Sequence, residues 1–224
     1  MNVKTAHPNF LIWCCFVLGL AFSSVVNAAD DQSDINREAL AAARSGNVGR
    51  CKTLIEQGAS PNTRNRVGDS LLMTAIKAGH ADIVVLLLER GADVNLANVD
   101  QVTPLMAAAY YEHPDMARML IDNNADVNAV DQTQKSAMVY AAGKGQTEIV
   151  ERLLATQKMT PNTAYNNGLT ALMWAGASGH VATVQALLKH GADPAMVDNR
   201  GKTVLQMAEE NGFPDVVKLL QARK

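Results

Sequence analysis

Aromatic residues make up only 4% of the 224-residue chain, and cysteine occurs three times. A core must therefore be built from aliphatic side chains, and a disulfide-dense scaffold is excluded. Apolar residues still make up 48% of the chain, too many for a disordered tail. The 20 Lys and Arg nearly balance the 22 Asp and Glu, with no long run of one sign. A nucleic-acid partner, which would bind through released counterions, is not expected.

The N-terminal segment has the order of a secretory signal peptide. Lys4 is its single charge, an apolar run occupies residues 10–22, and Val26 and Ala28 supply small residues before a cleavage point. We predict a signal peptide over residues 1–28, cleaved after Ala28, with cleavage one residue later as the alternative. Residues 29–33 are expected to form a short acidic linker.

This segment predicts export of the remaining chain. A 13-residue apolar run is short for a bilayer span, which needs about 20 residues, so an uncleaved anchor is the second interpretation. We expect the periplasm as the location, with a secreted or N-terminally membrane-anchored chain as alternatives. After cleavage, no membrane association is expected. The mature chain then keeps Cys51 alone, so no internal disulfide is expected.

The rest of the chain repeats itself every 33 or 34 residues. One column of the repeat reads Gly46, Gly79, Glu112, Gly145, Gly179 and Gly212, and another reads Leu54, Leu87, Leu120, Leu153, Leu187 and Leu220. Six units therefore tile residues 34–224, with approximate bounds 34–66, 67–99, 100–132, 133–166, 167–199 and 200–224. No non-repetitive domain is left over.

Each unit predicts two short helices. Thr103 and Pro104 form an N-cap followed by a proline at the first helical position. Gly79 supplies a turn, and the apolar spacing of residues 83–88 predicts a second, amphipathic helix. Gly91 is typical of a helix end.

These features resemble the ankyrin repeat. Residues 102–108 (Val-Thr-Pro-Leu-Met-Ala-Ala) resemble its first half, and residues 79–95 resemble its second half. The resemblance implies an all-α solenoid of six helix-turn-helix units with connecting loops or β-hairpin tips. Two departures stand out: Met106 replaces the family's usual His, and residues 157–162 lack the Gly-Ala-Asp of the other units, where a bend or mobile turn is expected.

The repeat explains the residues that could otherwise be candidates for catalysis or metal binding. His80, His113 and His180 occupy one repeat position. Helix layers lie roughly 8–10 Å apart, whereas a zinc–nitrogen bond is about 2.0–2.1 Å long. We expect these histidines to bond to local backbone and Cys51 to be a buried core residue, with a reactive thiol as its alternative. No catalytic residue, metal or cofactor is predicted, and an enzyme or small-ligand binder is the least favoured interpretation.

The resemblance implies a non-enzymatic scaffold that binds another protein through a concave face of first helices and loop tips, and acts as a monomer. A secreted effector that binds a host protein is the alternative. Tyr and Trp are enriched at binding hot spots, and five of the six aromatic residues after residue 28 fall on this face. Tyr140 and Trp174 could instead fill space between helices. The predicted contact residues are Arg66, Asp69, Lys77, Val99, Val102, Tyr110, Tyr111, Gln132, Lys135, Tyr140, Lys144, Tyr165, Asn167, Leu169, Trp174, Arg200 and Lys202.

Overall fold

The computed structural model describes residues 31–222, and the predicted signal peptide lies outside them. Residues 31–45 are helical, so the linker prediction is wrong for residues 31–33. The helices that follow are α2 (Val48–Glu56), α3 (Leu71–Ala78), α4 (Ala81–Glu89), α5 (Pro104–Tyr110), α6 (Pro114–Asp122), α7 (Ala137–Gly143), α8 (Thr147–Ala155), α9 (Ala171–Ala177), α10 (Val181–Lys189), α11 (Val204–Glu210) and α12 (Pro214–Gln221), with a 3-10 turn, η1 (Asn166–Gly168), before α9.

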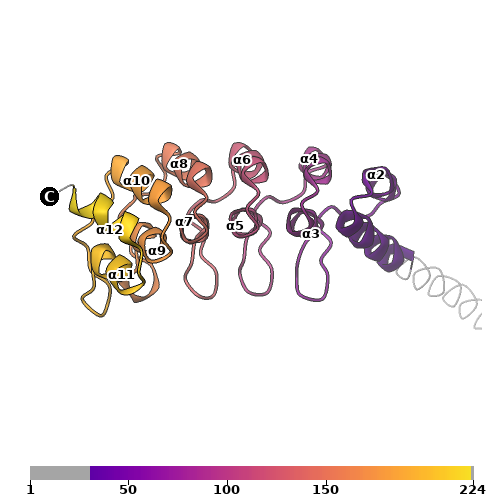
Figure 1. The fold of residues 1–224 in the computed structure, drawn as a ribbon. Coiled ribbons are helices and arrows are strands. Elements are labelled where there is room, and N and C mark those ends of the chain that lie inside the picture. The colour runs from indigo at the N-terminus through magenta and orange to yellow at the C-terminus, as the bar shows by residue number, and fades with distance from the viewer. Residues whose placement is uncertain (1–30, 223–224) are drawn as a thin grey trace, which may run out of the picture.

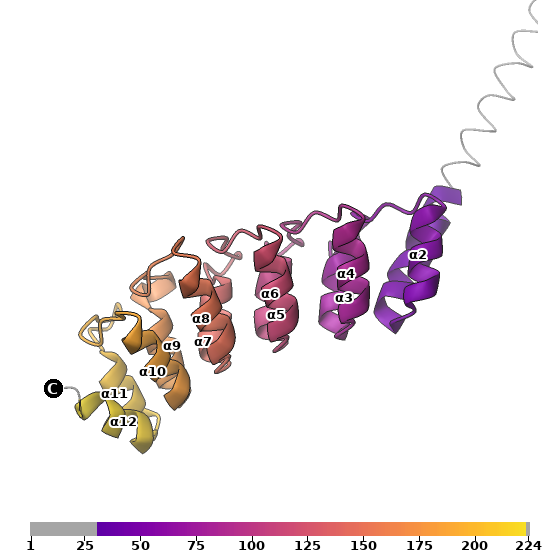
Figure 2. The same ribbon diagram turned by 90° about the horizontal axis from the view of Figure 1, so that it is seen from above.

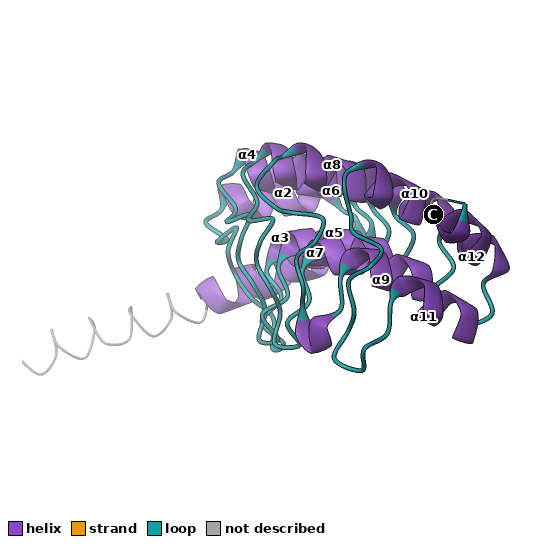
Figure 3. Ribbon diagram, turned by 90° about the vertical axis from the view of Figure 1, so that its left-hand side faces the viewer, coloured by secondary structure: helices purple, strands orange, loops and turns teal. Residues whose placement is uncertain are grey.

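Helix pairs stack side by side into a curved solenoid (Figures 1 and 2). The even-numbered helices α2 to α12 form an outer layer, and the odd-numbered helices α3 to α11 form an inner layer together with the helix of residues 31–45. Loops project from the inner layer on the side away from the outer helices (Figure 3). We call the surface made by the inner helices and these loops the inner face. The predicted all-α solenoid is confirmed.

Four of the five inner helices α3 to α11 begin after a residue whose side chain accepts an N–H of the first turn, and α7 is the exception. The Thr103 hydroxyl accepts a hydrogen bond from the Met106 N–H at 3.3 Å, and Pro104 follows it at the first helical position. The leucine column fills the core between layers: Leu54, Leu87 and Leu120 are at most 1% exposed. Cys51 is fully buried beside them, as predicted, and burial raises the pKa of its thiol.

The loop tips are turns, so the expected β-hairpin tips are not found within residues 31–222. A single antiparallel bridge joins Arg64 to Ser70 there. Most loops are held by the first residue's side chain instead: Asn98 Oδ1 accepts the N–H groups of Asp100 and Val102, each at 3.0 Å. Such side-chain turns offer the backbone an alternative to a strand ladder.

The turn between the two helices of a unit packs under a ring from the next unit. A Cβ on Gly46 would lie 2.7 Å from the His80 ring, and one on Gly145 would lie 2.6 Å from the His180 ring. Each of these glycines also has a positive φ, which disfavours other residues.

The His80 and His180 rings bond to backbone, but the partner belongs to the preceding unit and is not local as predicted, and the His113 ring makes no hydrogen bond within residues 31–222. His80 Nε2 lies 3.1 Å from the Arg44 carbonyl oxygen, and His180 Nε2 lies 3.0 Å from that of Gly143. These histidines therefore join units to each other.

No helix within residues 31–222 combines the length and apolarity needed to cross a membrane.

Candidate protein-binding surface

Four aromatic side chains gather at the middle of the inner face. Tyr110 ends α5, Tyr111 follows it, Tyr140 lies on α7 and Trp174 lies on α9. The Tyr110 ring meets the Tyr111 ring at 5.1 Å and the Tyr140 ring at 5.7 Å between centroids, both edge to face. We call these four residues the aromatic cluster. Sequence reasoning placed all four on this face.

Two lysines lie against the rings of the cluster. Lys144 Nζ is 4.7 Å from the Tyr110 ring centroid, and Lys135 Nζ is 5.2 Å from that of Trp174. A cation over an aromatic face is attracted by the ring's quadrupole. The cluster therefore combines exposed ring edges with positive charge, which suits contact with both apolar and acidic groups.

The rings differ in how freely they can meet a partner. Tyr110 and Tyr111 are 45% and 42% exposed, whereas Tyr140 and Trp174 are half-buried. The Tyr140 hydroxyl donates a hydrogen bond to Asp131. Burial and the neighbouring Asp131 carboxylate raise the pKa of Tyr140 above its ordinary range. Tyr110 and Tyr111 are thus the rings best placed for contact.

Asp131 is the anchor beneath Tyr140. Its carboxylate also accepts the N–H groups of Thr133 at 2.8 Å and Lys135 at 3.0 Å. Burial alone would raise the pKa of Asp131, but the hydrogen bonds from Tyr140, Lys135 and Thr133 outweigh it and lower that pKa below its ordinary value.

A shallow hollow of about 200 Å³ lies beside the cluster, lined in part by Lys77, Met106 and Tyr111. Lys77 is held there by Asp69, with Nζ 2.8 Å from the carboxylate. Asp69 itself is only 5% exposed and also accepts a hydrogen bond from Asn98 Nδ2 at 3.0 Å. Predicting Asp69 as an exposed contact residue was therefore wrong, because its carboxylate is turned to these two donors.

The predicted loop residues are exposed to different degrees. Arg66, Val99, Gln132, Asn167 and Arg200 are exposed, whereas Val102, Lys135, Tyr165, Leu169 and Lys202 are half-buried. Several bond to neighbours: Gln132 Nε2 donates to the Val99 carbonyl oxygen at 2.7 Å, Arg200 pairs with Asp198 at 2.7 Å, and Lys202 pairs with Glu210 at 2.6 Å. The loops thus form a row that is partly fixed before any partner binds.

A family model described as "Ankyrin repeats (3 copies)" matches residues 39–131 and again residues 138–224. The chain belongs to the ankyrin-repeat family. Ankyrin repeats generally serve as non-enzymatic binding scaffolds. Within residues 31–222, no group of three His, Cys, Asp or Glu is arranged to hold a metal ion.

The chain is similar to ankyrin-repeat and regulatory proteins over part of its length. It is 40% identical over 87 residues to "Putative ankyrin repeat protein YahD" of Escherichia coli (strain K12), covering 37% of this chain and 43% of that protein. It is 38% identical over 77 residues to "Protein phosphatase 1 regulatory subunit 27" of Homo sapiens, covering 34% and 50%. The chain thus spans half or less of these relatives' length.

A solved structure extends the ankyrin likeness over most of the chain. Its description reads "Bd0816 Predatory Endopeptidase from Bdellovibrio bacteriovorus in complex with immunity protein Bd3460". The matched chain has a TM-score of 0.76 and 30% identity, and the match covers 83% of this chain and 97% of that one.

Sequence reasoning missed two exposed arginines on the same side of the ankyrin stack. Arg44 and Arg64 line a second hollow together with Arg66, which was predicted. The signal for Arg44 was available: it lies two residues before a turn glycine, in the register of Lys77 and Tyr110. Arg64 carried no such signal, because its position in the loop shows only in the fold.

Proposed function

We propose that this chain is an exported ankyrin-repeat scaffold, without catalytic activity, that binds another protein through the inner face. The observation that carries the proposal is the pair Tyr110 and Tyr111, two residues that are each over 40% exposed in a chain with few aromatics. Tyrosine is enriched among the residues that contribute most of the binding free energy at protein interfaces. A matched fold in a solved endopeptidase–immunity protein complex supports a protein as the partner.

Export rests on the N-terminal sequence alone. The basic Lys4, the apolar run and the small residues before Ala28 support delivery to the periplasm and release of a monomer without membrane contact. Tagged full-length chain and a form lacking residues 2–28 can be expressed in the same bacterium and fractionated. We expect the full-length chain in the periplasmic fraction, shortened at its N-terminus, and the truncated form in the cytoplasm. Recovery of both in the cytoplasm would refute export.

The binding surface is tested with a paired substitution. Tyr110→Ala/Tyr111→Ala removes both exposed rings, while Val85→Ala/Arg118→Ala removes two exposed side chains from the outer helices α4 and α6 as a matched control. Each purified mature protein is immobilised, and proteins retained from a periplasmic extract are quantified by mass spectrometry. Circular dichroism checks that every variant is folded.

We expect at least one protein to be retained by the wild type and the control, and to fall at least tenfold with the tyrosine variant. Equal retention by all three proteins would show that the aromatic cluster is not the binding surface. Retention only from extracellular or host-cell extract, with the same variant pattern, would keep the surface and move the partner outside the periplasm.

A further inference from the structure

The second hollow lies at the N-terminal end of the inner face. It encloses about 450 Å³ between the helix of residues 31–45 and the first loop, and four arginines line it: Arg37, Arg44, Arg64 and Arg66. Arg37 and Arg44 are seven residues apart and so lie on one face of their helix. Arg64 and Arg66 are two residues apart in the first loop, and both line the hollow. We call this the arginine hollow.

The arginine hollow occupies a place that a neighbouring loop fills elsewhere in the stack. The Val99 N–H donates to the Val67 carbonyl oxygen at 3.4 Å, and the Gln132 N–H donates to that of Asp100 at 3.0 Å. Within residues 31–222, the first loop has such a neighbour only on its C-terminal side, because no loop hangs below the helix of residues 31–45 (Figure 1). The row of loops therefore ends at an open side.

The charge in the hollow is largely unbalanced. Arg37 pairs with Asp34 at 2.8 Å, but both groups are well exposed, so this pair is weak. Arg44, Arg64 and Arg66 are exposed and have no ion-pair partner within residues 31–222. The chain as a whole carries a formal charge of −2, so this excess is local. A planar guanidinium matches a carboxylate with two parallel hydrogen bonds.

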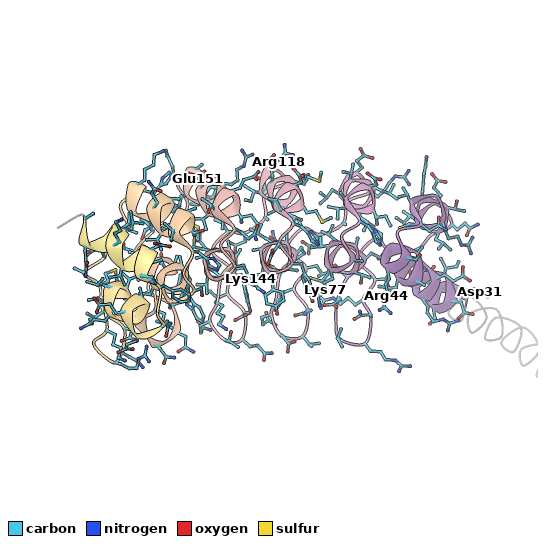
Figure 4. The ribbon with its side chains drawn as sticks, viewed as in Figure 1. Asp31, Arg44, Lys77, Arg118, Lys144 and Glu151 are labelled. Carbon is cyan, nitrogen blue, oxygen red and sulfur yellow. The ribbon has the colours of Figure 1, made fainter. Side chains whose placement is uncertain are left out.

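The hollow lies in line with the aromatic cluster along the inner helices. Arg44, Lys77 and Tyr110 occupy the same position in successive units, and Figure 4 shows Arg44, Lys77 and Lys144 along the inner helices, away from Arg118 and Glu151 on the outer layer. A segment that starts in the hollow and follows the inner helices passes Lys77 before it reaches Tyr110.

We propose that the arginine hollow receives an acidic segment of the partner protein, whose carboxylates pair with Arg44, Arg64 and Arg66. This inference rests on the proposed function and adds the chemistry of the partner. A protein segment fits better than a nucleic acid, because the excess positive charge is confined to this hollow, on a chain with a formal charge of −2 and no long run of basic residues that could follow a phosphate backbone.

The test uses a fluorescein-labelled peptide of eight glutamates interspersed with glycine. Its affinity for the mature protein is measured by fluorescence anisotropy at 50 and 300 mM NaCl. The hollow variant is Arg44→Gln/Arg64→Gln/Arg66→Gln, and the matched control is Arg90→Gln/Arg118→Gln/Arg152→Gln on the outer helices. Gln keeps most of the side-chain length and removes the charge. A single-stranded DNA oligonucleotide of equal charge is the competing probe.

We expect the peptide to bind the wild type and the control alike, with at least tenfold weaker binding by the hollow variant and a strong loss at high salt. Absence of peptide binding, equal weakening in both variants, or tighter binding of the oligonucleotide than of the peptide would each overturn the proposal. Since no natural partner is used, these outcomes are independent of the tyrosine experiment, and either proposal can fail alone.

Discussion

The second and fourth units have the same two helices, but they make different hydrogen bonds to the units before them. In the second unit, His80 bonds to the Arg44 carbonyl oxygen, and Val99 bonds to the loop before it. In the fourth unit, Gln146 stands in place of that histidine and makes no side-chain hydrogen bond within residues 31–222, and no backbone hydrogen bond joins residues 131–135 to residues 165–169. The stack thus continues here through core packing, the hydrogen bond from Asn128 to the Lys158 carbonyl oxygen and the Arg152–Asp122 ion pair.

Single residue differences explain the irregular contacts of the fourth unit. Tyr165 heads the fourth unit's loop, where Asn or Asp heads the others and accepts two loop N–H groups. Without that acceptor the loop forms the 3-10 turn η1, with Asn167 at φ 62°. On the other side, Asn95 Oδ1 accepts the Asp126 N–H at 2.8 Å, but Asn128 instead donates to the Lys158 carbonyl oxygen. The fourth unit, which carries Tyr140, thus lacks counterparts of the His80 and Val99 hydrogen bonds of the second unit.

The largest loss of stability is expected from filling the space beneath the His180 ring. Gly145→Ala puts a Cβ 2.6 Å from the His180 ring at a positive φ, and we expect a loss of about 2–4 kcal/mol in the free energy of unfolding. Gly212→Ala is the control, with a similar φ (74° against 71° at Gly145) and open space around the added Cβ, and should lose about 1 kcal/mol. Urea titrations followed by circular dichroism measure both. Equal losses would mean that the ring does not constrain the turn.

A smaller loss of stability should distinguish the contact at His80 from the equivalent position in the fourth unit, Gln146. His80→Ala removes the bond to the first unit and should lower the free energy of unfolding by about 1–2 kcal/mol. Gln146→Ala, at the same position of the fourth unit, should lower it by less than about 0.5 kcal/mol. The same urea titrations apply, and a larger loss at Gln146 than at His80 would reverse the comparison.

The smallest effect is a pH dependence confined to loops headed by aspartate. The pKa of Asp131 is lower in the folded chain than in the unfolded one. Its stabilisation is therefore complete above the unfolded pKa, near 3.9, and is lost as the pH falls through the lower folded pKa. Between pH 7 and pH 3, wild type should lose up to about 1 kcal/mol more than Asp131→Asn, which keeps an acceptor without a charge. Identical urea midpoint shifts would contradict this. Loops headed by Asn65 and Asn98 carry no such dependence.

The sequence was sufficient to predict the stack and insufficient to predict its contacts. The sequence predicted the units from the 33-residue period and the inner helices from starts such as Thr103–Pro104. The leucine column predicted the core and the buried Cys51. Each of these features depends on local chemistry. Asp69 was misplaced because its burial depends on Lys77 and on Asn98 of the next loop. Of the arginine hollow, Arg44 could have been predicted from its register, whereas Arg64 and the open side of the first loop are visible only in the fold.

The rings over the turn glycines also restrict how the number of repeats could have changed. Losing the second unit would align His113 with Gly46, and losing the third would align Gln146 with Gly79, so a glycine would still face the incoming side chain. Losing the fourth would bring His180 onto Glu112, whose side chain begins where the ring needs space. We therefore expect deletion of the fourth unit to be tolerated less well than deletion of the second or third, unless Glu112 is replaced by glycine at the same time.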